Sequence, residues 1–111
     1  MNLQLGDVVL LRMRFHQSPS SKVRPAVALL DVGDDDFVAA PVTSQSRNSE
    51  FDVPIREWQA AGLNVESWLR VHKLTVLSKV EIVRPLGRLT RSDREVLAHA
   101  LCQAFCPRQK A

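Results

Sequence analysis

Three short polar sets in this sequence carry side chains that can act on a phosphate group. The first is Arg24, which follows a polar loop that contains His16. The second is Val42-Thr43-Ser44-Gln45 and the third is Arg70-Val71-His72-Lys73. Guanidinium, hydroxyl and imidazole groups together suit the attack of a ribose 2′-hydroxyl on its own phosphate, which needs a base, an acid and cations. That reaction needs no metal, and RNA supplies the 2′-hydroxyl that DNA lacks.

These sets define the candidate site residues. No Gly-rich phosphate loop, His-Glu metal motif or nucleophile elbow occurs, so we expect neither a metal nor a cofactor. The candidate catalytic residues are Arg24, Thr43, Arg70 and His72. The candidate substrate-binding residues are His16, Lys22, Ser44, Gln45 and Lys73.

Each candidate also has a purely structural interpretation. Arg24 can be a solvated charge at a strand end, since most exposed arginines are solvated. Thr43 can cap a turn, as Ser and Thr near loops often do. His72 can be an ordinary strand histidine. The residue types alone do not decide between these interpretations and the catalytic one.

The stretch around Arg24 predicts how that side chain is held. The residues from Lys22 to Leu30 read as a strand that becomes apolar and buried, and 31–34 supplies a turn. Pro25 favours an extended backbone at Arg24. The sequence therefore predicts one guanidinium at a defined place, where a polar loop meets a core strand.

The third set is predicted to lie on a strand over 68–77. Arg70 and His72 are two residues apart, so on a strand they point to the same face. Arg70 can also pair with a nearby acid, either Glu66 or Asp52. This spacing predicts that a guanidinium and an imidazole share one face of the strand.

Most of the remaining chain predicts short strands, and its end predicts a helix. Pro41 cannot donate a hydrogen bond to a β-ladder, so its strand is expected at an edge of the sheet or bent at this residue.

Thr90 and Asp93 mark the start of a helix over 91–105, with an apolar stripe at Val96, Leu97, Ala100, Leu101, Ala104 and Phe105. The other predicted elements are strands over 6–14, 37–43, 51–55 and 81–83, and one or two helical turns over 56–61 that stop at Gly62. The fold class is therefore mainly β (α+β), a small barrel-like sheet with a C-terminal helix.

Composition is that of one small globular domain spanning 1–111. Of the 111 residues 45% are hydrophobic, and the formal net charge of +3 permits nucleic acid or an acidic protein as partner. Neither a signal peptide nor a membrane span is apparent, so we expect a cytoplasmic protein with reduced thiols at Cys102 and Cys106. Those cysteines and His99 lack a further cluster to complete a metal site.

The order of several short motifs resembles that of the MazF/PemK-like toxins of type II toxin–antitoxin systems. These motifs are Gly6-Asp7-Val8-Val9, Arg24-Pro25-Ala26-Val27, Val42-Thr43-Ser44-Gln45, Leu69-Arg70-Val71-His72-Lys73-Leu74 and Leu86-Gly87-Arg88-Leu89. The resemblance implies an SH3-like barrel of the CcdB/MazF type, a homodimer and a ribosome-independent endoribonuclease. Such enzymes cut single-stranded RNA, usually leaving a 2′,3′-cyclic phosphate and a 5′-hydroxyl, and a cognate antitoxin blocks their groove.

The resemblance also implies roles for individual residues. Arg24 matches the catalytic arginine of the family, Thr43 its catalytic threonine or serine, and Arg70 an arginine that some members use as the acid. His72 stands where the family often has an acidic residue, which leaves the general base open. His16 lies in the loop where some members carry a histidine.

Two functions of other kinds compete with the nuclease. One is a non-catalytic, gyrase-targeting toxin like CcdB, and the other is an RNA-binding SH3-like module. The arrangement of Arg24, Thr43 and Arg70 favours the nuclease, because CcdB-like proteins lack it.

Overall fold

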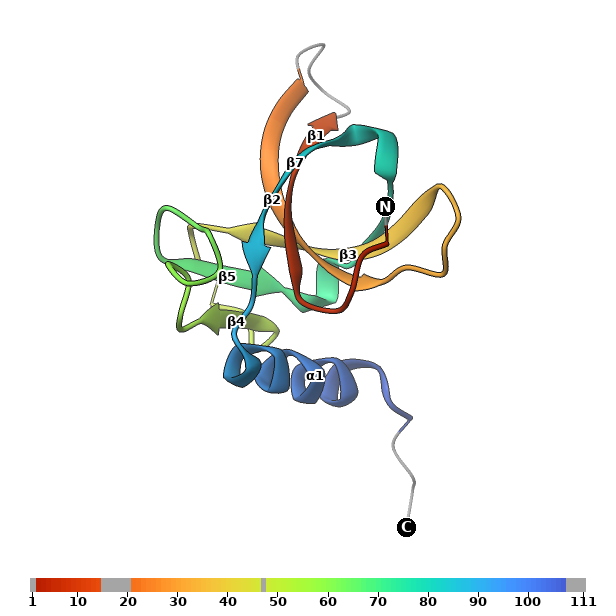
Figure 1. The fold of residues 1–111 in the computed structure, drawn as a ribbon. Coiled ribbons are helices and arrows are strands. Elements are labelled where there is room, and N and C mark those ends of the chain that lie inside the picture. The colour runs from red at the N-terminus through yellow and green to blue at the C-terminus, as the bar shows by residue number, and fades with distance from the viewer. Residues whose placement is uncertain (1, 15–20, 47, 108–111) are drawn as a thin grey trace.

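The structure is a computed structural model that describes residues 2–14, 21–46 and 48–107. Within this part the chain forms seven β-strands, two short 3₁₀ turns and one α-helix (Figure 1). Their bounds are β1 Asp7–Arg14, β2 Ser21–Leu30, β3 Asp36–Thr43, β4 Asp52–Ile55, β5 Ser67–Arg70, η1 Val71–Lys73, β6 Thr75–Ser78, η2 Lys79–Glu81, β7 Ile82–Arg88 and α1 Arg91–Phe105. The predicted fold class, mainly β with a C-terminal helix, is confirmed.

The strands form one strongly curved antiparallel sheet. Its strand order is β4-β5-β3-β2-β1-β7, and β6 pairs with β3 outside this path. In Figure 1 the ribbons of β1, β2 and β7 form part of a ring. β3 thus has β2 on one side and, on the other side, first β6 and then β5. Of the two alternatives predicted for the Pro41 strand, an edge position or a bend, the edge position is wrong, because β3 lies between β5 and β2.

The change of partner along β3 explains why 68–77 is not one strand. β6 pairs with β3 up to Ala39–Thr75, and β5 resumes the pairing at Val42–Leu69. Between these two pairs β3 has two residues, 40 and 41, whereas the segment that joins β5 to β6 has five, 70–74. Three residues of that segment therefore have no counterpart on β3. The 3₁₀ turn η1 accommodates them opposite the ladder gap at Pro41, which has no N–H to donate.

Two apolar clusters lie on opposite faces of the sheet. Alternation along β2 sends Val27 into the larger cluster and Ala26 and Ala28 into the smaller one, which also holds Phe37. A strand buried on both faces needs a continuous apolar run, which is the pattern read from the sequence. The predicted burial of this strand is confirmed for Ala26, Val27 and Ala28, whereas Leu30 is exposed.

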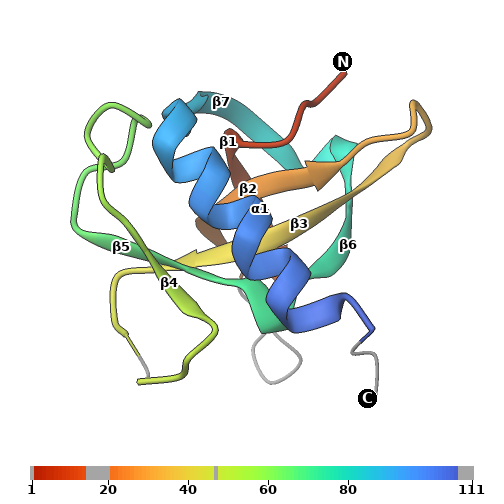
Figure 2. The same cartoon turned by 90° about the horizontal axis from the view of Figure 1, so that it is seen from below.

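Helix α1 closes the larger cluster from one side, as Figure 2 shows. It begins as predicted, with the Thr90 hydroxyl accepting a hydrogen bond from the Asp93 N–H at 3.3 Å. Leu97 and Ala100 are buried, and Leu101 and Ala104 pack at the margin. Val96 and Phe105 of the predicted stripe are exposed instead.

The predicted helical turns over 56–61 form a series of hydrogen-bonded turns rather than a helix. Six residues are too few to form a helix without strong outside contacts. Here the buried Asp93 carboxylate of α1 accepts hydrogen bonds from the N–H groups of Arg56 and Glu57, at 3.3 and 2.9 Å. Gly62 ends the segment, as predicted, with φ +90°.

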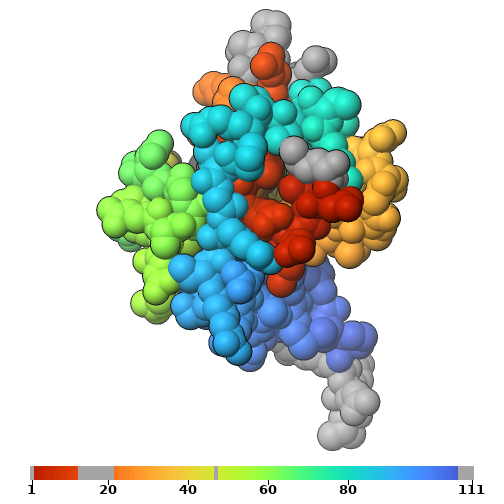
Figure 3. Space-filling view, in the orientation of Figure 1, coloured from red at the N-terminus to blue at the C-terminus, as the bar shows by residue number. Residues whose placement is uncertain are grey.

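Gly62 and β7 approach each other so closely that no side chain fits between them. A Cβ on Gly62 would lie 2.1 Å from the Leu86 carbonyl oxygen. Figure 3 shows the green segment around Gly62 against the cyan β7. This contact holds the 56–65 segment beside β7.

We predict that Gly62→Ala destabilises the fold far more than Gly33→Ala. Gly33 is a matched control, because its φ is +95° but nothing lies within 4 Å of an added Cβ. Left-handed strain alone should cost about 1–2 kcal/mol at Gly33, and the added backbone clash should raise the loss at Gly62 above about 3 kcal/mol. Urea unfolding measures both, and equal losses would refute the close contact.

Asp31 ties three segments together at the end of β2. Its carboxylate accepts hydrogen bonds from Lys79 Nζ at 2.8 Å, Leu3 N at 2.7 Å and Gly33 N at 2.8 Å. The bond from Lys79, aided by those two N–H groups, lowers the pKa of Asp31 from 3.8 to about 2. The folded state therefore favours the ionised carboxylate more than the unfolded state does.

This shift predicts a defined acid dependence of stability. Between about pH 4 and about pH 2 the unfolded chain binds the Asp31 proton more readily, so the free energy of unfolding falls as the pH falls. Asp31→Asn should lose stability at neutral pH and show a shallower fall across this window. Asp34→Asn, which alters an exposed carboxylate of the same turn, is the control. If the free energy of unfolding fell equally with pH for the wild type and for Asp31→Asn, the prediction would be contradicted.

Candidate functional site

Arg70 at the end of β5 is held by a buried carboxylate. Its Nε lies 3.2 Å from Asp52 Oδ1, and the Asp52 side chain is 0% exposed against 24% for Arg70. The two residues are paired across β4 and β5, so both project from the same face of the sheet. Of the two partners considered for Arg70 from sequence, the structure therefore selects Asp52 over Glu66.

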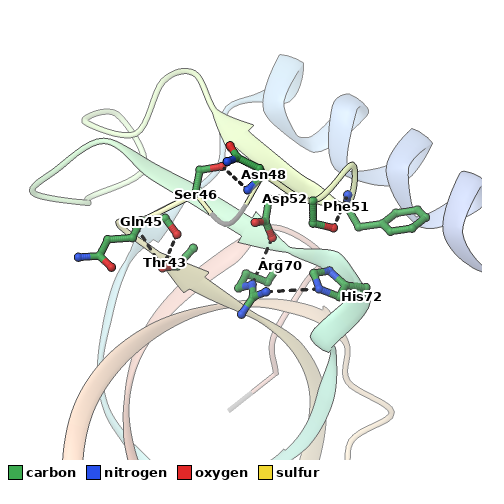
Figure 4. Close-up of polar contacts among 9 residues, drawn as sticks. Thr43, Gln45, Ser46, Asn48, Phe51, Asp52, Arg70 and His72 are labelled. Atoms are coloured by element: carbon green, nitrogen blue, oxygen red, sulfur yellow. Dashed lines mark hydrogen bonds and ion pairs between the residues drawn. The ribbon is translucent and has the colours of Figure 1, made fainter.

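His72 completes this cluster from the turn η1. Its Nε2 lies 3.4 Å from Arg70 Nη2, as Figure 4 shows. A guanidinium has only donors, so Nε2 is the acceptor in this contact. Nδ1 is buried and has no hydrogen-bond partner in the described part of the chain. The prediction that Arg70 and His72 share one face of a strand is wrong, because β5 ends at Arg70, and it is the turn η1 that brings His72 against Arg70.

Thr43 lies beside this cluster at the end of β3. It is paired with Trp68, and Arg70 lies two residues further along β5, so Thr43 and Arg70 are diagonal neighbours on one face. The Thr43 hydroxyl accepts a hydrogen bond from Gln45 N at 3.1 Å and lies 3.2 Å from Gln45 O (Figure 4). The turn-capping interpretation of Thr43 therefore describes this structure.

Arg24 lies on β2 and lines a pocket of about 470 Å³. Arg24 is exposed, and no carboxylate among the described residues lies within ion-pair distance of its guanidinium. Ser44 lines the same pocket, whose walls come from β1, β2, β3, β7 and the 62–67 segment. The lining residues are Leu10, Arg24, Pro25, Val42, Ser44, Gly62, Leu63, Asn64, Val65, Ser67, Arg84 and Leu86.

The pocket and the Arg70 cluster meet at one end of the β2–β3 pair. The ladder ends at Ala26–Pro41, and Arg24 and Thr43 each lie two residues beyond it on antiparallel strands. Both residues are therefore at the same end of the pair. Thr43 in turn neighbours Arg70 through β5. The fold gathers Arg24, Thr43, Arg70 and His72 at this end without direct hydrogen bonds between Arg24 and the other three.

The remaining predicted binding residues lie around the same end or outside the description. Lys22 on β2 and Lys73 in η1 are exposed, as is Gln45, whose backbone meets Thr43. His16 falls outside the described residues. Their roles as substrate-binding residues remain predictions.

Sequence reasoning missed Arg84 and Asn64 as residues of the pocket. Arg84 precedes Pro85 as Arg24 precedes Pro25, so a second Arg-Pro step was available as a signal. Asn64 sits in the loop between β4 and β5 and carries no motif.

In the part of the chain that is described, His, Cys, Asp and Glu residues do not gather in threes or more as a metal site would require. Cys102 and Cys106 are free and exposed at the end of α1. Over the same described residues, no helix has the length and apolar character to cross a membrane.

The sequence profile of the PemK-like, MazF-like toxins of type II toxin–antitoxin systems matches residues 4–105. The chain belongs to this family. It is a MazF-type toxin, which confirms the resemblance read from the motifs and favours it over the CcdB-like alternative. No curated protein matches the chain in sequence.

Solved MazF structures share this fold at low sequence identity. The Mycobacterium tuberculosis toxin MazF-mt6 is 22% identical with a TM-score of 0.73, covering 89% of this chain and 95% of its own. An endoribonuclease from a mycobacterial species, solved in complex with its cognate antitoxin, is 18% identical with a TM-score of 0.70, covering 94% of each chain. The MazE–MazF complex from Deinococcus radiodurans gives 17% identity and a TM-score of 0.72, covering 90% of this chain and 92% of that one.

Proposed function

We propose that this MazF-type toxin is an endoribonuclease that cuts single-stranded RNA by 2′-hydroxyl attack, without a metal. The observation that supports this most is the gathering of Arg24, Thr43, Arg70 and His72 at one end of the β2–β3–β5 strands. It combines cations for the phosphate with an imidazole for proton transfer. Two solved structures with this fold, both of a mycobacterial endoribonuclease, agree with the proposal.

In the proposed reaction Arg24 and Arg70 bind the scissile phosphate. A guanidinium stays protonated in proteins, so Arg70 serves as a cation and not as a proton donor. When the phosphate accepts the Nη2 hydrogen bond that Arg70 otherwise gives to His72, the Nε2 lone pair becomes free to accept the proton of the 2′-hydroxyl. The bond from O2′ to phosphorus forms as the bond to O5′ breaks. O5′ takes a proton from water, and the imidazolium returns one to solvent, which leaves a 2′,3′-cyclic phosphate and a 5′-hydroxyl.

The first test is cleavage of labelled single-stranded RNA by the purified protein in excess chelator. We expect cutting at short sequences, unchanged by the chelator, and none of DNA of the same sequence. Cutting that the chelator abolishes, or equal cutting of DNA, would contradict the proposal. Binding of RNA without cutting would instead support the RNA-binding module.

The second test ranks the site residues. The phosphorane formed during attack carries more negative charge than the bound substrate, so a preset guanidinium stabilises it selectively. Arg24→Ala should slow single-turnover cleavage by about a hundredfold or more. Thr43→Ala should cost less, because a neutral hydroxyl bond contributes about 0.5–1.5 kcal/mol.

Arg91→Ala, which removes an exposed arginine on α1, is the matched control for the loss of one positive charge. Melting temperatures of all three variants should stay near that of the wild type, since Arg24 is exposed and fills no core space. Near wild-type cleavage by Arg24→Ala would overturn the site assignment.

We also propose a homodimer and a cognate antitoxin as partners. Exposed apolar side chains at Leu30, Val32 and Val76 lie where a second chain can cover them. Solved relatives include complexes with an antitoxin and with MazE. A basic groove near Arg24, Arg70 and Lys73 suits an acidic or apolar antitoxin segment.

A further inference from the structure

We propose that the pocket beside Arg24 holds one nucleotide of the RNA, with Arg84 on its phosphate and Asn64 at its base. This inference rests on the proposed nuclease function, because Arg24 is its proposed catalytic cation. It adds two residues that the motifs of the family resemblance did not include. The occupant is a single unstacked nucleotide next to the cut bond.

The first support is that Arg24 and Arg84 flank the same strand. On β1, Leu10 is paired with Arg84 of β7 and the next residue, Leu11, with Arg24 of β2, so the two arginines lie on either side of β1, one residue apart along it. Both of them line the pocket. Adjacent strands lie about 4.8 Å apart, which puts the β2 and β7 backbones about 10 Å apart. Both arginines precede a proline, which favours an extended backbone at each.

The second support is the lack of charge compensation. Arg70, Arg88 and Arg91 each lie within 4.0 Å of a carboxylate, as the pairs with Asp52, Asp7 and Glu95 show. Neither Arg24 nor Arg84 has such a partner among the described residues, although both line one concave site. Two guanidinium groups with free donors favour an anionic ligand with several oxygens, such as a phosphodiester.

The third support is the contrast with two other pockets in the described part of the chain. One is lined by Glu50 and the other by Asp34 and Asp36, and neither has a basic lining residue. The carboxylates that line those two pockets repel an anion, whereas the two guanidinium groups that line the Arg24 pocket attract one. The charge distribution therefore selects the Arg24 pocket for the RNA strand.

The inner lining suits a base as well as a phosphate. Leu10, Val42, Leu63 and Leu86 give apolar walls for the faces of a ring. Asn64 lines the same pocket, and a side-chain amide offers both donors and an acceptor, which is what reading a base edge in single-stranded RNA requires. Ser67, by contrast, already donates its hydroxyl to Val65 O at 2.8 Å.

The test measures binding of short random-sequence RNA whose 2′-hydroxyls are methylated, so that it cannot be cut. Arg84→Ala should weaken binding about tenfold and reduce the slope of log affinity against log salt by about 0.7, the share of one phosphate contact. Arg84→Lys should keep most of the salt slope, because it retains the charge. Arg91→Ala, whose arginine is paired on α1, should change neither quantity.

Asn64→Ala tests the base contact separately. Sequencing the products cut from an unmodified random RNA pool should show a relaxed base preference at one position next to the cut, while the preferences at the other positions stay as in the wild type. An unchanged preference would overturn the role of Asn64.

The outcomes separate this inference from the proposed function. If wild-type protein cuts RNA while Arg84→Ala binds it with unchanged affinity and salt slope, the pocket inference fails and the nuclease stands. A protein partner as the occupant of the pocket would give that same result. If wild-type protein neither binds nor cuts RNA, the proposed function itself fails.

Discussion

The exchange of partners along β3 is the constraint on which the rest of the structure depends. On one side β3 pairs with β2, and on the other it pairs first with β6 and then with β5. The gap between these two ladders lies at Ala40 and Pro41, and the three extra residues opposite it form η1. That turn buries Val71 in the core and brings His72 against Arg70. A backbone irregularity thus creates the contact between the imidazole and the guanidinium.

Charge compensation divides the arginines at this end of the barrel into two kinds. Arg70 is fixed by the buried Asp52, so its position is set before any ligand arrives. A buried carboxylate is costly unless it is paired, which ties the fold of β4 and β5 to this arginine. Arg24 and Arg84 have no carboxylate partner in the described part of the chain and lie at the surface of a pocket. One fixed cation and two uncompensated ones together suit a phosphodiester strand, whose phosphates are spaced along it.

Local sequence patterns predicted most of the fold but not the contacts that depend on register. The apolar run of β2 and the Thr90 cap of α1 are signals within a few residues, and both are confirmed. The break of 68–77 into β5, η1 and β6 depends on β3, which lies about thirty residues earlier in the chain, and alternation alone cannot show it. Arg24, Thr43, Arg70 and His72 could be chosen by residue type and motif. Arg84 shares the Arg-Pro step of Arg24, but that step does not place it at the pocket, because only the pairing of β1 with both β2 and β7 brings Arg84 there.

The central claim is that the 2′-hydroxyl next to the cut bond is the nucleophile, and one measurement tests it most directly. Once a cleaved site is known, a single 2′-deoxy nucleotide is placed on the 5′ side of that bond in an otherwise unchanged RNA. The account predicts that cutting stops at this bond alone, while a second site in the same strand is cut at its usual rate and ends in a 2′,3′-cyclic phosphate. Continued cutting at the substituted bond would contradict the account, because water or another nucleophile would then attack the phosphate.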